Sequence, residues 1–181
     1  MKGMNKIKRG KNFRGVVSYA LAPAPHHMTS PVVIGGNLVG TTVDELTAEF
    51  ARTHQLRENV AKPVWHNSLR LPAGESLSKV QWKLIADDYM TRMGFSDTHL
   101  RCYVLHNDEA GQHIHIIASR INVLVDGQLY LGKNENLVST RIIQELERDH
   151  QLTRTKGPSP AKPSKKQSKL TRNESMMQNR T

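Results

Sequence analysis

Three histidines and an aspartate fall within ten residues of the stretch HNDEAGQHIHIIASR, which begins at His106. Successive side chains of a β-strand point to opposite faces, so His113 and His115 are expected to share one face and the isoleucines between and after them the other. His106 ends the preceding apolar segment, and a hairpin through NDEAGQ would place it beside the other two. The spacing therefore predicts three imidazoles gathered on one face of a strand pair.

Three imidazoles with open positions around them are the arrangement of a catalytic metal centre, because a structural site is closed by four ligands. Neutral imidazole is the commonest metal-ligating side chain. We predict that His106, His113 and His115 bind a divalent metal, and that Asp108 holds one imidazole by its other N–H. By intrinsic affinity such a site favours Zn²⁺ or Ni²⁺. The alternative interpretation is a polar strand face turned to water.

A basic charge balance indicates an anionic substrate. The chain of 181 residues has a formal net charge of +10 and a pI of about 9.9. A nucleic acid is the natural partner, and a metal could polarise a phosphodiester oxygen. Residues 151–181 contain eight Lys or Arg and one acidic residue, Glu174, so this end carries most of the net positive charge. We predict one domain over residues 1–152 and a basic, disordered tail or linker over residues 153–181.

Tyr19 is the candidate nucleophile among the four tyrosines. It falls in a segment of helical periodicity, NFRGVVSYAL, close to a cluster of basic residues. Tyr89 and Tyr103 have the spacing of core residues, and Tyr130 follows an Asp-Gly turn. Taken alone, Tyr19 is also compatible with an ordinary, partly buried tyrosine. That cluster consists of Lys6, Lys8, Arg9, Lys11 and Arg14, and Tyr19 could present its hydroxyl to a phosphate there.

The helices and strands that would position these residues are predicted from hydrophobic periodicity and from the positions of proline and glycine. Helices are predicted over residues 12–21, 41–60, 76–94 and 139–150. Strands are predicted over residues 64–71, 100–106 and 113–125, with a short one at 126–131, whereas residues 22–40 have a loop-like composition. Hairpin-like links between strands favour an α+β fold with an antiparallel sheet covered by helices.

Two classes of protein are disfavoured. A single cysteine, Cys102, rules out an internal disulfide framework and is compatible with a reducing compartment. The longest apolar runs fall well short of the ~20 residues that span a bilayer. The basic start lacks the apolar segment of a secretory signal. We therefore expect no membrane insertion and a cytoplasmic location.

Three stretches in this order carry a family resemblance: SYAL on the first helix, WHNSLRLPAGESLS before a helix, and HNDEAGQHIHIIASRIN. Together they resemble the relaxase/mobilization nuclease family of the MobA type, over about residues 1–152. The resemblance implies a five-stranded antiparallel sheet with helices packed on it. It also implies a nickase that cleaves one DNA strand at a plasmid transfer origin. Its cofactor would be Mg²⁺ or Mn²⁺. Its partners would be single-stranded DNA, accessory relaxosome proteins and a coupling protein in the bacterial cytoplasm.

Position by position, the resemblance makes Tyr19 the nucleophile that stays joined to the 5′ phosphate, with the three histidines as metal ligands. It makes Asp108 the residue that orients a histidine or helps to activate the tyrosine. Where relatives commonly have His-x-Ser-Leu-Ser, this chain has Arg70 in place of the last serine. On a strand, His66, Ser68 and Arg70 share a face. The predicted DNA-binding residues are Lys8, Arg9, Lys11, Arg14, His66, Ser68 and Arg70.

Two other functions remain open at this point. A rolling-circle replication initiator or a transposase uses the same His-x-His chemistry, but it usually places its tyrosine after the histidine pair. A non-catalytic basic DNA-binding module would have the histidines on its surface. Its binding would follow salt concentration without dependence on metal or on Tyr19.

Overall fold

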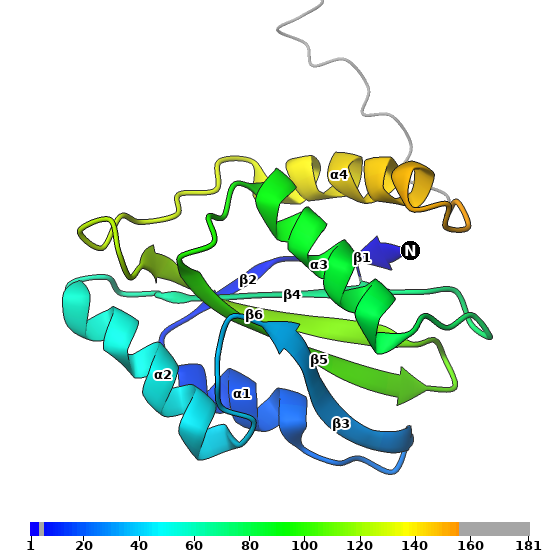
Figure 1. The fold of residues 1–181 in the computed structure, drawn as a ribbon, viewed down its shortest axis with the longest axis horizontal. Coiled ribbons are helices and arrows are strands. Elements are labelled where there is room, and N and C mark those ends of the chain that lie inside the picture. The colour runs from blue at the N-terminus through cyan, green and yellow to red at the C-terminus, as the bar shows by residue number, and fades with distance from the viewer. Residues whose placement is uncertain (4–5, 156–181) are drawn as a thin grey trace, which may run out of the picture.

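An antiparallel sheet runs through the middle of the molecule and has helices on both faces (Figure 1). The computed structural model describes residues 1–3 and 6–155. No helix in this part of the chain is long and apolar enough to cross a membrane. The elements in chain order are β1 (Lys2–Gly3), β2 (Lys8–Gly10), α1 (Phe13–Leu21), β3 (His27–Gly36), α2 (Val43–Leu56), β4 (Val64–Arg70), α3 (Lys79–Met93), β5 (His99–Asp108), β6 (His113–Asn122) and α4 (Glu135–Asp149).

The strands occupy five positions across the sheet, in the order β1-β4-β6-β5-β3, and β2 pairs with the same edge of β4 as β1 does. All pairs are antiparallel, and β5 and β6 form the predicted hairpin. The α+β class and the five-stranded antiparallel sheet with helical cover are therefore confirmed. The long central pairs β4–β6 and β5–β6 fix the register of every residue that the next subsection discusses.

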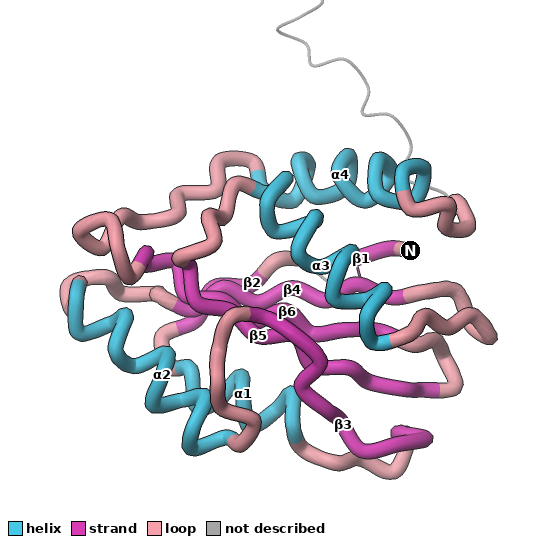
Figure 2. Tube along the Cα trace, in the orientation of Figure 1, coloured by secondary structure: helices cyan, strands magenta, loops and turns pink. Residues whose placement is uncertain are grey.

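Helices α1 and α2 cover one face of the sheet, and α3 and α4 cover the other (Figure 2). The two faces bury different sets of side chains. Leu105, Ile114 and Ile116 point toward α3 and α4 and join the larger apolar core. Val104 and Ile117 point the other way and pack with the buried residues of α1 and α2. Because side chains alternate along a strand, His106, His113 and His115 are on the α1–α2 face.

Local signals explain where the helices begin and end. The side chain of Asn12 accepts a hydrogen bond from the Arg14 N–H at the start of α1, and Pro23 follows its end. Ser78 and the residue at the third helical position form a reciprocal capping box at the start of α3. Gly94 ends α3 in a left-handed conformation, with φ of 103°.

The prediction of a loop over residues 22–40 is wrong for residues 27–36, because β3 forms there as the edge strand beside β5. Pro31 and the two glycines at its end hid the strand. An edge position tolerates proline, since its missing N–H would point to solvent, and the register shifts at Thr29–Val32 absorb it. The short strand predicted at 126–131 reduces to one isolated bridge between Ile121 and Leu129.

The end of the described chain packs onto the domain. Glu147 of α4 accepts hydrogen bonds from the amine of Met1, at 2.9 Å, and from the Thr155 backbone N–H, at 2.8 Å. The Thr153 hydroxyl donates to Glu75. Residues 153 and 155 thus contact the domain, and the rest of the basic tail predicted for residues 153–181 lies outside the described residues.

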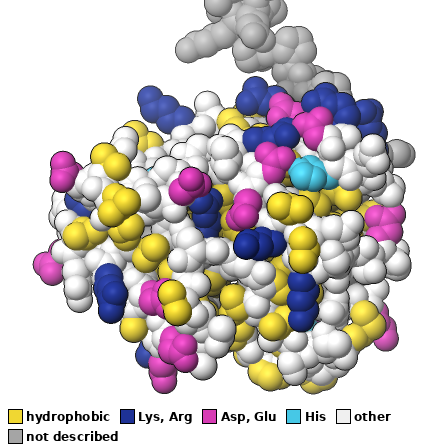
Figure 3. Space-filling view, viewed as in Figure 1, with side chains coloured by type: hydrophobic (Ala, Val, Ile, Leu, Met, Phe, Trp, Pro, Cys, Tyr) yellow, Lys and Arg dark blue, Asp and Glu magenta, His cyan; other side chains and the backbone are white. Residues whose placement is uncertain are grey.

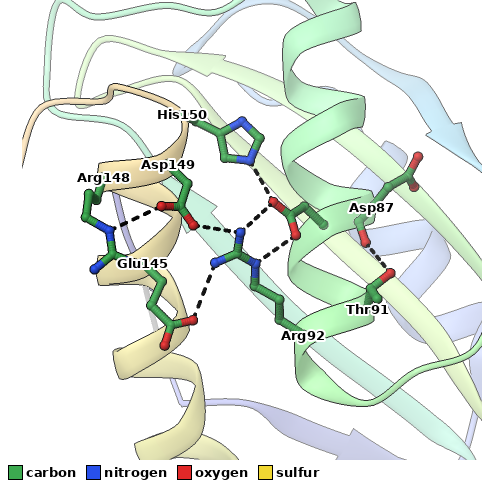
Figure 4. Close-up of polar contacts among 8 residues, drawn as sticks. Asp87, Thr91, Arg92, Glu145, Arg148, Asp149 and His150 are labelled. Carbon is green, nitrogen blue, oxygen red and sulfur yellow. Dashed lines mark hydrogen bonds and ion pairs between the residues drawn. The ribbon is translucent and has the colours of Figure 1, made fainter.

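Helices α3 and α4 are joined at their exposed ends by charged side chains. On this face of the molecule, basic and acidic side chains are intermixed (Figure 3). The Arg92 guanidinium contacts Asp88 and Asp149 at 2.8 Å each and Glu145 at 3.4 Å (Figure 4). His150 also lies 2.8 Å from the Asp88 carboxylate. These contacts link the two helices above the apolar core.

Replacing Arg92 with alanine is expected to lower the free energy of unfolding by about 1 kcal/mol, since partly exposed ion pairs contribute little individually and more as a network. Urea unfolding followed by circular dichroism measures the change. Arg141→Ala is the matched control, because the Arg141 side chain is 71% exposed and its one ion pair among the described residues, with Glu145, has a distance of 3.8 Å. Equal losses from the two variants would contradict a network contribution.

Candidate active site

The histidines of the β5–β6 hairpin come together on the α1–α2 face of the sheet. His106 and His113 are direct partners across the two strands, and His115 lies two residues further along β6. Their ring centroids are 4.9 Å apart for His106 and His113, 4.3 Å for His106 and His115, and 5.2 Å for His113 and His115. One ring nitrogen from each lies within 4.8 Å of the others. This spacing allows all three to approach one cation.

Each imidazole is oriented through one nitrogen, which leaves the other available. A carbonyl oxygen can only accept, so His113 donates from Nδ1 to the Gly111 carbonyl, at 3.2 Å, and His106 donates from Nε2 to the Ala20 carbonyl, at 2.6 Å. His115 Nδ1 lies 2.9 Å from His66 Nε2. Hydrogen bonding of one ring nitrogen is the usual way in which metal-ligating histidines are held.

The histidines are neutral at physiological pH. Burial lowers the pKa of His113 to about 4. Burial, with the neighbouring imidazoles of His106, His66 and His113, lowers the pKa of His115 to about 2. Burial also lowers the pKa of His106. Three neutral imidazoles with free lone pairs form a donor set that fits a divalent metal ion. The assignment of these residues as ligands stays a prediction.

Tyr19 lies beside the hairpin histidines at the surface of the molecule. Its side chain is 67% exposed, and its ring meets the His115 ring edge-on at a centroid distance of 5.9 Å. The hydrogen bond from His106 to the neighbouring Ala20 fixes this turn of α1 over the hairpin. The other tyrosines, Tyr89, Tyr103 and Tyr130, are 8% exposed or less and belong to the core beneath α3 and α4.

Asp108 ends β5 beside the histidines, with 9% of its surface exposed. Its Oδ2 lies 3.8 Å from His113 Nδ1, which is beyond hydrogen-bonding distance. Two histidines that the sequence analysis did not single out, His26 and His27, approach the same carboxylate at 3.8 and 3.6 Å. His26 comes just before β3, and His27 is the first residue of β3 and the strand partner of Asp108. The adjacent pair HH was the signal, but it lay in the segment interpreted as a loop.

A pocket of about 510 Å³ brings these groups together. Strand β4 directs the side chains of His66, Ser68 and Arg70 toward this pocket. The register of β4 with β6 sets His66 across from Ile117 and Arg70 across from His113. The Arg70 Nε is buried and has no hydrogen-bond partner among the described residues, so the pocket contains an unpaired donor. The lining includes Tyr19, Asp108 and the three hairpin histidines, and the predicted DNA-binding residues that line it are Lys8, His66, Ser68 and Arg70.

The other predicted DNA-binding residues lie away from this pocket. Arg9 points to the opposite side of the sheet, where it pairs with Glu135 at 3.2 Å and donates to the Leu131 carbonyl. Arg14 pairs with Asp44 of α2 at 2.8 Å. Lys11 lines a separate depression between α1 and α2. Lys6, in contrast, lines the pocket with Lys8.

His66 is oriented toward His115 as well as toward the pocket. The two rings are stacked, with centroids 5.2 Å apart, and Ser68 Oγ also lies 3.2 Å from His115 Nδ1. Burial and the charge of Lys8 lower the pKa of His66 to about 4, so it is neutral at pH 7. A neutral imidazole is a weak phosphate ligand but a good hydrogen-bond partner for another histidine.

Comparison with known families agrees with this geometry. A family model for relaxases, described as the MobA/VirD2-like nuclease domain, matches residues 19–152. The match begins at Tyr19 and includes Asp108 and the hairpin histidines. The chain belongs to the MobA/VirD2-like relaxase nuclease domain family. Members of this family are DNA-nicking endonucleases that bind single-stranded DNA and typically use a divalent metal. Neither the curated proteins nor the solved structures contain a match.

Acid should destabilise the protein in the presence of a chelator. In the unfolded chain, imidazole takes up a proton near pH 6.5, whereas the buried His66 and His113 do so only near pH 4. Between these values the unfolded state binds more protons, so the free energy of unfolding falls as pH decreases. The stabilisation is complete above about pH 6.5. Urea unfolding at several pH values between 7.5 and 4.5 measures it.

His113→Gln is the control for this titration, because glutamine keeps a polar side chain without a proton-binding ring. Its stability should fall less steeply with acid than that of the unmodified protein. A variant curve parallel to the original would show that other groups, such as carboxylates, account for the dependence.

Proposed function

We propose that this chain is a site- and strand-specific relaxase that nicks single-stranded DNA at a plasmid transfer origin and forms a covalent 5′-phosphotyrosine link through Tyr19. The observation that carries the proposal is the position of an exposed tyrosine over a buried group of neutral histidines, in one pocket of a relaxase nuclease domain. The buried positions of the other three tyrosines support the choice of Tyr19.

In the proposed reaction the Tyr19 hydroxyl oxygen attacks the scissile phosphorus. A bond forms between phosphorus and the phenolic oxygen, and the bond between phosphorus and the 3′ oxygen breaks. The phenolic proton passes to Asp108, directly or through an imidazole, and the departing oxygen takes up a proton to become a free 3′-OH. The new phosphodiester preserves the bond energy, so the reverse attack by a 3′-OH can reseal a strand.

The hairpin histidines would hold a divalent ion, which when bound neutralises charge on the phosphate and orients it. Their depressed pKa values leave their lone pairs free for this purpose. Lys8 and Arg70 line the pocket and supply positive charge for the DNA backbone, with Arg70 in the place of the hydroxyl that relatives have. We assign His66 and Ser68 the role of orienting His115, in addition to contact with DNA.

In this proposal residues 1–152 form the nuclease domain, and the basic segment after it is an arm on phosphates or a linker. Plasmid mobilization would require accessory relaxosome proteins and a coupling protein, and would take place in the bacterial cytoplasm. Mg²⁺ or Mn²⁺ is the proposed ion in function, although a set of imidazoles binds Zn²⁺ or Ni²⁺ more tightly.

Tyr19→Phe should abolish strand cleavage while leaving DNA affinity within about 1 kcal/mol of the unmodified protein, because only an exposed hydroxyl is removed. A denaturing gel would show a heat-resistant protein–DNA adduct for the unmodified chain and none for the variant. Tyr130→Phe is the matched control, since the Tyr130 hydroxyl is buried, has no hydrogen-bond partner among the described residues, and lies outside the pocket. An adduct of normal yield from Tyr19→Phe would contradict the assignment of the nucleophile.

Cleavage should require a metal ion, and the binding of that ion should depend on the hairpin histidines. Excess chelator should stop adduct formation, and Mg²⁺ or Mn²⁺ should restore it. His113→Ala should weaken metal binding and reduce cleavage strongly while Tyr19 remains in place. Isothermal titration with Zn²⁺, Ni²⁺, Mn²⁺ and Mg²⁺ measures the binding, and the gel measures the reaction. Cleavage that continues unchanged in chelator would refute this part of the mechanism.

A further inference from the structure

A second group of metal-ligating side chains lies next to the hairpin histidines. It consists of His26, His27 and Asp108, and one ligand atom of each lies within 4.8 Å of the others. Its members come from the loop after α1, the first residue of β3 and the last residue of β5. The His27 ring is 4.6 Å from the His106 ring, so the two groups adjoin within the same pocket.

The distances within this group suit a shared ion better than hydrogen bonds. His26 Nε2 lies 3.8 Å from Asp108 Oδ2, and His27 Nε2 lies 3.6 Å from Asp108 Oδ1. Both separations exceed hydrogen-bonding distance. Two ligands of one metal, each at 2.0–2.2 Å, are about 3 to 3.5 Å apart, so an ion would draw these atoms together by a few tenths of an ångström.

The carboxylate of Asp108 supplies an independent reason. It is only 9% exposed, and its Oδ1 has no hydrogen-bond partner among the described residues. A buried carboxylate oxygen without a partner is costly, and a cation is the natural way to satisfy it. His26, in contrast, is 67% exposed, which leaves one side of the group open to water or to a ligand oxygen.

We propose that His26, His27 and Asp108 form a second metal-binding site, which takes a divalent transition-metal ion beside the histidine site of the β5–β6 hairpin. Two imidazoles and one carboxylate favour Zn²⁺, Co²⁺ or Ni²⁺ over Mg²⁺ or Ca²⁺, which prefer oxygen ligands throughout. The three residues line the pocket in which the proposed nucleophile Tyr19 lies, and they also line a neighbouring depression with Glu109.

Occupation of this site has a structural consequence at Ala24. The Ala24 N–H donates to His27 Nδ1 at 3.2 Å, so the single proton of the neutral ring resides on Nε2. Binding of a metal through Nε2 moves that proton to Nδ1, which can then no longer accept from Ala24. The Ala24 amide is therefore a local reporter of this second ion.

Equilibrium dialysis of the full chain against Co²⁺, with bound metal measured by mass spectrometry, tests the proposal. The expected result is two equivalents for the unmodified protein and the loss of one equivalent in either His26→Gln or His27→Gln. His26→Gln is the cleaner variant, because an exposed side chain can be replaced without disturbing the fold. His150→Gln is the matched control, since His150 lies between α3 and α4, and it should keep two equivalents.

A third variant separates this proposal from the proposed function. His113→Ala should lose the equivalent bound by the hairpin and keep the one bound by His26, His27 and Asp108. With Zn²⁺ in nuclear magnetic resonance, the Ala24 amide should shift as the second equivalent binds. One equivalent in the unmodified protein that His113→Ala removes, two equivalents that persist in both His26→Gln and His27→Gln, or an unmoved Ala24 amide would overturn the second site without affecting the first.

Discussion

The pairing of His106 with His113 across the β5–β6 hairpin is the constraint on which the rest of the site depends. Because the strand period is two, this register also places His115 on the same face and sends the isoleucines between them into the opposite core. A slip of one residue would exchange the two sets and bury the imidazoles beneath α3. The apolar requirement of the larger core therefore holds the histidines in position, and no contact among the rings themselves needs to do so.

Burial of neutral imidazoles costs free energy of folding, and the apolar packing on the opposite face of the sheet offsets this cost. The face beneath α3 and α4 buries the larger apolar core, which includes Trp65, Trp82 and Ile116. The other face packs a smaller apolar cluster beneath α1 and α2 and leaves its remaining length polar. Stability thus comes mainly from one side of the sheet, and the candidate active site lies on the other, where each ring is held by a carbonyl, a hydroxyl or another imidazole.

Strong local patterns made the centre of the site predictable from the sequence. The alternation in HIHII and the helical spacing around Tyr19 placed the histidines and the tyrosine on elements of the correct type, and the turn between the strands supplied the hairpin. The edge strand β3 was missed because Pro31 and its glycines resemble a loop, and the histidines at its start were missed with it. The partners of Arg9 and Arg14 were not predictable either. Glu135 and Asp44 are distant in sequence, and only the tertiary fold shows that these basic residues are paired with acids.

A helix, not a strand, carries the tyrosine, and this has a physical reason. Side chains on the central strands of this sheet lie beneath helices or inside the pocket, as the buried Tyr103 illustrates. A residue at the end of a short surface helix can stay exposed while its neighbour is anchored. The backbone carbonyl of Ala20 accepts the hydrogen bond from His106, whereas Tyr19 projects beside His115. The same turn of α1 is therefore fixed to the histidines through its main chain and open to a strand of DNA through its side chain. In the proposed reaction the attack must also run in reverse, and this requires a nucleophile whose place relative to the phosphate is set by the protein before DNA arrives.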